Sequence, residues 1–169
     1  MPCWPSVAEP KPAVVYDINV LVAAFVGPDS EWPYIAQVPP STDNADADAL
    51  SIAFDADEFS LYSSPHIMEN LARVLVELGV QPARVADVVD AVLEIVETSG
   101  GAVIDPPRRA FDVADHEDNL ILDLAVAAGA TIVVSNDTDL TSLSLWHNRI
   151  PIMRPREFVA RVVQLRRGR

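Results

Sequence analysis

Residues 115–140, DHEDNLILDLAVAAGATIVVSNDTDL, contain the pattern that decides the fold of this chain. Asp115 is a typical N-cap residue, and the two acids in the following turn suit the positive end of a helix dipole. Residues 120–128 are apolar at every position except Asp123. This pattern predicts a helix that is buried on more than one face.

A glycine and a short strand follow this helix. Gly129 stands where a C-terminal glycine belongs, and residues 130–134 are apolar and rich in β-branched side chains, as in a strand inside a parallel sheet. Asp137 and Asp139 come just after this strand, and open α/β sheets bind their ligands at the carboxyl ends of the strands. One acid at a helix start and another at a strand end therefore predict a metal site.

The rest of the chain continues the alternation of strands and helices. We expect further strands at residues 13–16, 59–62, 101–104 and 150–153, and helices at residues 17–25, 65–78, 82–99 and 155–167. Such alternation argues for the α/β class with a parallel sheet.

The length of 169 residues and the hydrophobic content of 50% suit one domain, which we place at residues 13–169 after a disordered leader of residues 1–12. Residues 28–58 hold eight acids and four prolines. We interpret them as an acidic insertion with a short helix near residues 45–53.

Membrane insertion, secretion and disulfide bonding are not expected. The apolar runs are much shorter than the roughly 18–20 residues that span a bilayer, and the N-terminus lacks an apolar signal segment. The single cysteine, Cys3, excludes an internal disulfide framework and a cysteine-rich zinc site. We therefore expect a cytoplasmic protein.

The formal net charge of −13 is distributed unevenly. Residues 12–72 contain no Lys or Arg, whereas residues 154–169 contain six of the twelve. A domain this acidic does not bind a polyanion by simple counterion release. The basic tail or bound cations can still bind one locally. The alternative is that the acidity serves solubility and the tail is a solvated helix end.

Four acids are candidates for one metal site: Asp17, Glu69, Asp118 and Asp137. Three lie at a strand end or a helix start, and Glu69 lies about one turn into a helix, with a side chain long enough to reach back. Carboxylates that lie close together raise one another's pKa, and a divalent cation relieves this repulsion. Mg²⁺ and Mn²⁺ prefer oxygen ligands, and their bound water is a nucleophile, so the expected reaction is hydrolysis of a phosphate ester.

Neighbouring acids have structural interpretations. Asp115 serves as an N-cap, and Glu117 complements the helix dipole and faces solvent. Asp123 follows Asp118 by five positions, about 140° around the helix, so it is expected to face elsewhere. Asp139 either caps a turn or helps to hold the metal.

The segments around these acids resemble the motifs of PIN-domain nucleases. DINVLVA (residues 17–23) looks like the opening motif, and SPHIMENLARVL (64–75) is similar to the second. DHEDNLILDLA (115–125) and GATIVVSNDTDL (129–140) resemble the third and fourth, and IPIMRPREF (150–158) is typical of the final strand and helix. The resemblance covers roughly residues 13–160.

This resemblance implies a single-domain α/β/α sandwich around a central parallel sheet, with a Mg²⁺- or Mn²⁺-dependent endoribonuclease site. Carried over by position, Asp17, Glu69, Asp118 and Asp137 form the acidic quartet. Asp139, which follows the last of them closely, is counted with them as a candidate metal ligand. Many small bacterial members are toxins of VapC-type toxin–antitoxin pairs, so RNA and a cognate antitoxin are the implied partners. The insertion at 28–58 departs from the shortest toxins. Members often form homodimers, for which the apolar face of the 82–99 helix is a candidate, although core burial explains that face equally.

Other functions fit less well. Haloacid-dehalogenase-like phosphohydrolases and receiver domains require a lysine, and phosphohydrolases of this kind also carry a second Asp two residues after the first. This chain has Asn19 at that position, and its only lysine is Lys11. No G-x-G-x-x-G turn supports dinucleotide binding. The remaining alternative is a PIN-like module that binds protein partners and is catalytically weak.

Overall fold

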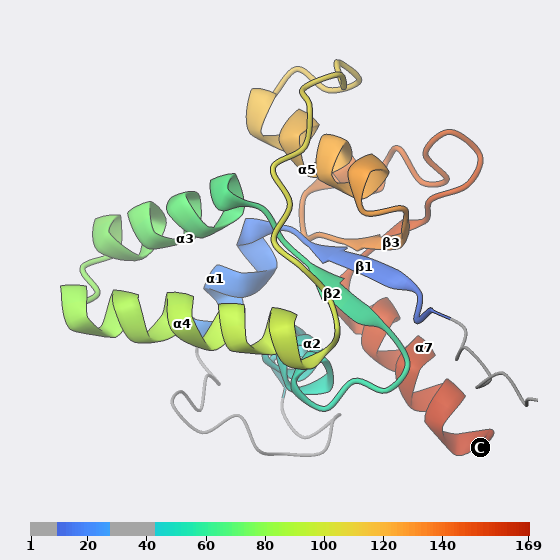
Figure 1. Cartoon of the computed structure of the whole chain (residues 1–169), viewed down its shortest axis with the longest axis horizontal. Coiled ribbons are helices and arrows are strands. Elements are labelled where there is room, and N and C mark those ends of the chain that lie inside the picture. The colour runs from blue at the N-terminus through green and yellow to red at the C-terminus, as the bar shows by residue number, and fades with distance from the viewer. Residues whose placement is uncertain (1–9, 28–42) are drawn as a thin grey trace, which may run out of the picture.

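Four parallel strands form the centre of the computed structural model, which describes residues 10–27 and 43–169 (Figure 1). They pair in the order β2-β1-β3-β4. The strands are β1 (Ala13–Tyr16), β2 (Ser60–Tyr62), β3 (Ala130–Val134) and β4 (Ile152–Met153). All of β1 is buried between its two neighbours, which explains its apolar sequence. The predicted α/β class with a central parallel sheet is confirmed.

Helices cover both faces of the sheet. α1 (Ile18–Val26), α2 (Ala45–Phe54) and α7 (Pro155–Arg167) lie on one side, and α5 (His116–Ala127) packs on β1 and β3 from the other (Figure 1). Tyr16 of β1 faces the first group, because its ring packs edge-on against Phe158 of α7 with the centroids 5.7 Å apart. Its hydroxyl donates to the carbonyl of Ala49 in α2 at 2.8 Å. The three layers make an α/β/α sandwich.

The remaining helices lie at the ends of the strands. α3 (Pro65–Glu77) and α4 (Pro82–Thr98) form a pair beside β2 (Figure 1). α6 (Thr138–Thr141) is a single turn after β3. The apolar stripe of α4 is buried within this chain, at Val85, Val88, Val92, Ile95 and Val96. The core therefore accounts for this stripe without a dimer.

The strand predicted at residues 101–104 is wrong. This segment makes a single parallel bridge, in which Ser63 donates its N–H to Ala102 at 3.1 Å and accepts one from Ile104 at 2.8 Å. A positive φ of 85° at Gly100 turns the chain out of α4, and Pro106 and Pro107 follow shortly afterwards. Proline has no backbone N–H for a sheet, so the pairing stops after one residue.

The predicted insertion contributes a helix to the core. The short helix expected near residues 45–53 is α2, whose Ala49, Leu50 and Ile52 are buried; residues 28–42 lie outside the described part of the chain. Of the predicted leader, residues 1–9 also lie outside it. Lys11, however, donates its ammonium hydrogens to the carbonyls of Ala56 and Ser99 at 2.9 and 3.2 Å. The last residues of this leader thus pack against the domain.

None of the helices in the described residues has the length and apolar character needed to cross a membrane.

Candidate metal centre

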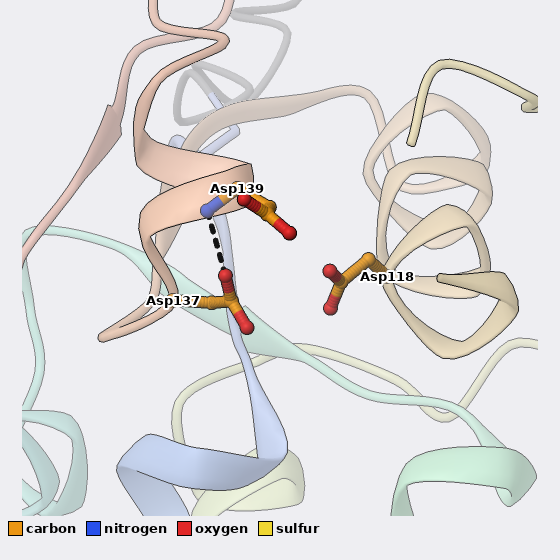
Figure 2. A group of neighbouring side chains, drawn as sticks. All are labelled: Asp118, Asp137 and Asp139. Carbon is orange, nitrogen blue, oxygen red and sulfur yellow. Dashed lines mark hydrogen bonds between the residues drawn. The ribbon is translucent and has the colours of Figure 1, made fainter. Parts of the chain in front are cut away.

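Three acidic side chains converge at the carboxyl end of the sheet. Asp118, Asp137 and Asp139 each offer a carboxylate oxygen, and these atoms all lie within 4.8 Å of one another. Figure 2 shows Asp118 pointing from α5 towards Asp137 and Asp139, which lie on the opposite side of the gap. Two segments within residues 115–140, the start of α5 and the turn after β3, thus supply all three acids.

The turn after β3 fixes Asp137 and Asp139 relative to each other. Asp137 is the N-cap of α6, and its Oδ1 accepts the N–H of Asp139 at 2.7 Å (Figure 2). The N–H of Asp137 donates to the hydroxyl of Ser135 at 2.9 Å, and the N–H of Asn136 donates to Oδ1 of Asn19 at 3.1 Å. These bonds join the end of β3 to the start of α1.

Asp17 lies beside this group with both carboxylate oxygens bonded. It is the N-cap of α1, where Oδ1 accepts the N–H of Ile18 at 2.7 Å. Oδ2 accepts hydrogen bonds from Asn19 Nδ2 at 2.7 Å and from the Ser135 hydroxyl at 2.6 Å. Only 5% of Asp17 is exposed. It therefore presents a fixed negative charge beside the three converging acids.

A pocket of about 370 Å³, which we call the acidic pocket, is lined by Asp17, Asp118 and Asp137. Its polar lining comes from α1, α3, α5 and the turn after β3: Asp17, Asn19, Asn70, Asp115, Glu117, Asp118 and Asp137. The structure thus brings Asp17, Asp118 and Asp137 of the predicted quartet together, with Asp139 in ligand distance of the last two.

The electrostatics of the pocket are dominated by repulsion. The pKa of Asp118 is raised to about 7, first because burial removes hydration from its carboxylate. The negative charges of Asp137, Asp17, Asp115 and Asp139 raise it further. Mutual repulsion among the acids, expected from the sequence, is therefore present in the folded protein.

Burial also raises the pKa of Asp17. Its hydrogen bonds from Ser135, Ile18 and Asn19 favour the ionised form, whereas the charge of Asp137 opposes it. The donors around Asp17 thus partly offset the cost of burying its charge.

The structure does not bring Glu69 to the acidic pocket. Asn70 and Val74 of α3 line it, and Glu69 lies one residue away from Asn70, about 100° around the helix, where it is exposed. Among the described residues that line this pocket, the remaining carboxylate outside the aspartates is Glu117. Asn70, which is 5% exposed, donates its Nδ2 hydrogen to Glu117 Oε2 at 2.7 Å.

Two neighbouring acids, Asp115 and Asp123, have structural roles. Asp115 caps α5 by accepting the N–H of Glu117 at 2.8 Å, although it also lines the pocket. Asp123 faces away from the converging acids: its Oδ1 accepts the N–H groups of Arg109 and Ala110 at 2.9 and 2.7 Å. This carboxylate therefore holds the segment that leads into α5.

The start of α2 also reaches the turn after β3. Asn136 donates its Nδ2 hydrogen to Oδ1 of Asp46 at 2.6 Å. Burial raises the pKa of Asp46, and this hydrogen bond from Asn136 opposes the rise. The acidic insertion thus supports the segment that carries Asp137.

Sequence reasoning missed Asn70, although a signal was present. Asn70 lies three residues after Ile67 and four before Val74, on the apolar stripe of α3. A polar residue on such a stripe needs a partner inside the protein, and here Glu117 and Arg73 provide it.

The donor set fits a hard divalent cation. Three carboxylates from two segments converge, and oxygen ligands of this kind suit Mg²⁺ or Mn²⁺. A cation between them would also favour ionisation of Asp118, whose charge is opposed by its neighbours.

Comparison with known proteins agrees with this arrangement. A family model described as PIN domain matches residues 13–139, a segment that contains Asp17, Asp118, Asp137 and Asp139. A search of curated proteins found no match. The family match covers most of the chain and includes every strand of the sheet except β4. The chain therefore belongs to the PIN-domain family, a family of nucleases.

Proposed function

We propose that this protein is a divalent-metal-dependent endoribonuclease acting in the cytoplasm. The observation that carries the proposal is the convergence of Asp118, Asp137 and Asp139, with their ligand atoms within 4.8 Å of one another, in a domain of a nuclease family. These three residues would hold Mg²⁺ or Mn²⁺, and Asp17 would add its charge beside them. A bound ion of this kind supplies a Lewis acid for the phosphate and a water nucleophile.

The residues around the acids support this chemistry by fixing their positions. Asp137 keeps one oxygen bonded to the N–H of Asp139, so its carboxylate has a defined direction across the pocket from Asp118. Ser135 and Asn19 hold Asp17 in the same way. Pre-organised ligands bind a cation without a further ordering cost.

Glu69 is not part of the proposed ligand set, because its side chain lies outside the acidic pocket. Glu117 would instead complete the ring of acids at the rim. Asn70 holds one of its oxygens, and Arg73 lies 3.6 Å from the other. A carboxylate held at this rim can accept a proton from water in the pocket.

The physiological role we propose is that of the toxin in a VapBC-type toxin–antitoxin pair. It is supported by the resemblance of the four motifs and by the open acidic pocket, which an antitoxin peptide would cover. A homodimer is proposed on the same resemblance alone.

One observation favours a second candidate function, a binding module with weak catalysis. Asn70 occupies the position on α3 that faces the pocket, so this helix contributes an amide there and no carboxylate. A nuclease with fewer metal ligands from the protein would bind its cation more weakly. The two functions differ in whether purified protein cleaves RNA at all.

The test is cleavage of end-labelled single-stranded RNA in Mn²⁺ or in EDTA, with Asp17→Asn in parallel. Under the nuclease proposal, wild type cleaves in Mn²⁺, fails in EDTA, and the variant loses most of its activity. Cleavage that persists in EDTA, or that is unchanged in Asp17→Asn, would count against the metal site. Absence of cleavage by wild type over a broad pool of RNA sequences would favour the binding module.

A further inference from the structure

To act on RNA, the acidic pocket must bind a polyanion. The chain itself carries a formal net charge of −13, which repels a polyanion. All twelve Lys and Arg residues lie within the described residues, so their contacts can be compared. Two of them have side chains that contact the acidic pocket or the turn after β3: Arg73 and Arg154. These two are therefore the basic side chains of the described residues that such contacts hold at the site.

Arg73 is already neutralised by acids of this chain. Its Nη1 lies 2.8 Å from Glu77 on the same helix, and its Nη2 lies 3.6 Å from Glu117. The same guanidinium donates to Oδ1 of Asn70. Arg73 thus serves to hold the Asn70–Glu117 pair, and little of its charge is left for a ligand.

Arg154 has a different environment. It follows β4 directly as the N-cap of α7, is exposed, and donates from Nη1 to the carbonyl of Asn136 at 3.1 Å. Its Nη2 lies 3.5 Å from the hydroxyl of Thr138. Both acceptors are uncharged, and no carboxylate in the described part of the chain lies within 4.0 Å of its guanidinium.

These contacts hold an uncompensated cation beside the turn after β3. Asn136 and Thr138 flank Asp137 in sequence, so the guanidinium is fixed beside the segment that carries Asp137 and Asp139. A guanidinium has five N–H donors in a planar fork, and two of its nitrogens are engaged here, which leaves donors for a phosphate. In a polyanion complex it would offset the repulsion from the acids next to it.

We propose that Arg154 binds a backbone phosphate of the nucleic acid next to the phosphodiester that is cleaved. This inference rests on the nuclease function proposed above, because it concerns the substrate of the same pocket. Arg154 thereby determines how the strand crosses the acidic pocket. The competing role is purely structural, in which Arg154 only braces the turn after β3.

The experiment compares Arg154→Gln, Arg154→Lys and the matched control Arg84→Gln. Arg84 is exposed in the first turn of α4 and has no contact with the pocket. Arg84→Gln therefore makes the same change in net charge as Arg154→Gln, but away from the site. For each protein, kcat and KM for a short labelled RNA strand of mixed sequence are measured in Mn²⁺ over a series of KCl concentrations. Binding of the same strand in EDTA is followed by fluorescence anisotropy.

The expected result is a fall of about tenfold in kcat/KM for Arg154→Gln, carried mainly by KM. The slope of log affinity against log salt becomes shallower by about 0.7, the value for one phosphate contact on a single strand. Arg154→Lys keeps most of the slope, because the charge remains. Arg84→Gln keeps the wild-type slope, and the Mn²⁺ concentration for half-maximal activity stays unchanged in every variant.

Two outcomes overturn the inference, and they are distinguishable. If Arg154→Gln keeps the wild-type salt slope but lowers kcat and weakens the Mn²⁺ response, Arg154 braces the turn and binds no phosphate, while the nuclease function stands. If wild type neither cleaves the strand nor binds it in EDTA, the proposed function fails and Arg154 has no phosphate to hold.

Discussion

The hydroxyl of Ser135 donates a 2.6 Å hydrogen bond to the carboxylate of Asp17, across 118 positions of the chain. Ser135 is fully buried, and its oxygen also accepts the N–H of Asp137 at 2.9 Å. One hydroxyl thus links the acid at the end of β1 to the acid at the end of β3. The parallel pairing of β1 and β3 places both strand ends side by side and makes this link possible.

We expect Ser135→Ala to weaken both stability and activity. The substitution removes a donor to a buried carboxylate, which costs about 1–2 kcal/mol and raises the pKa of Asp17 further. Urea unfolding and the pH dependence of cleavage measure the two effects, and the acid limb of activity should move to higher pH. Ser135→Thr keeps a hydroxyl and serves as the control. An Ala variant with the stability and pH profile of wild type would contradict this role.

Asp118→Asn is expected to abolish cleavage while stabilising the metal-free protein above neutral pH. The pKa of Asp118 is about 7 in the folded protein, against an ordinary value of 3.8. Between these values the folded state binds a proton that the unfolded chain releases, so this contribution to stability is full below about pH 4 and is lost as the pH rises through 7. Asparagine carries no charge to be repelled. The raised pKa corresponds to at most about 4 kcal/mol, and screening by solvent reduces the expected gain to about 2 kcal/mol at pH 8.

Urea unfolding in EDTA at about pH 5 and about pH 8 tests this linkage. The stability difference between Asp118→Asn and wild type should be larger at the higher pH. Asp90→Asn, at an exposed position on α4, makes the same change in net charge away from the pocket and should show no such increase. A difference in the free energy of unfolding that is independent of pH would show that burial and the neighbouring acids do not raise the pKa of Asp118.

The sequence indicated the positions of the acids at strand ends and at the start of α5 better than that of Glu69, which lies further along a helix. Asp17 and Asp137 follow buried strands, and parallel pairing brings such residues to one edge whatever the loops do. Glu69 was assigned to the site by aligning a helical motif. An error of one residue in such an alignment changes the direction of the side chain by about 100° around the helix. The apolar stripe of α3 sets that rotation, and it directs Asn70 to the pocket.

Contacts between distant segments were beyond prediction for a different reason. The strand expected at residues 101–104 has suitable residues, but the turn at Gly100 and the two prolines that follow limit it to a single bridge. Arg154 is one of six basic residues in the tail at 154–169, and nothing local distinguishes it from the other five; the pairing of β3 with β4 places it beside Asn136. Contacts between segments that are distant in the chain produce no local sequence pattern from which they could be predicted.

Glu69→Gln and Glu117→Gln form a matched pair that tests which glutamate serves the pocket. Both remove one charge and keep the shape of the side chain. We expect Glu69→Gln to cleave RNA within about twofold of wild type, because its side chain is exposed outside the pocket. Glu117→Gln should reduce kcat by about tenfold, as is usual for groups that support a metal site. The reverse pattern in the two kcat values would restore Glu69 to the site and remove Glu117.

Mn²⁺ is expected to stabilise the folded protein through Asp137. A ligand that binds only the folded state adds about 2.7 kcal/mol when its free concentration is 100 times Kd, which corresponds to a Tm increase of roughly 5–10 °C for a chain of this size. Thermal unfolding with and without Mn²⁺ measures the shift, and calorimetric titration gives the affinity. Asp137→Asn removes one of the three converging ligands and should lose most of the shift, because the remaining carboxylates bind the cation more weakly. Glu94→Gln, an exposed charge on α4, should keep it. If Asp137→Asn and wild type show equal Mn²⁺ shifts, the stabilising cation binds elsewhere on this acidic surface, and the converging acids are not the metal centre.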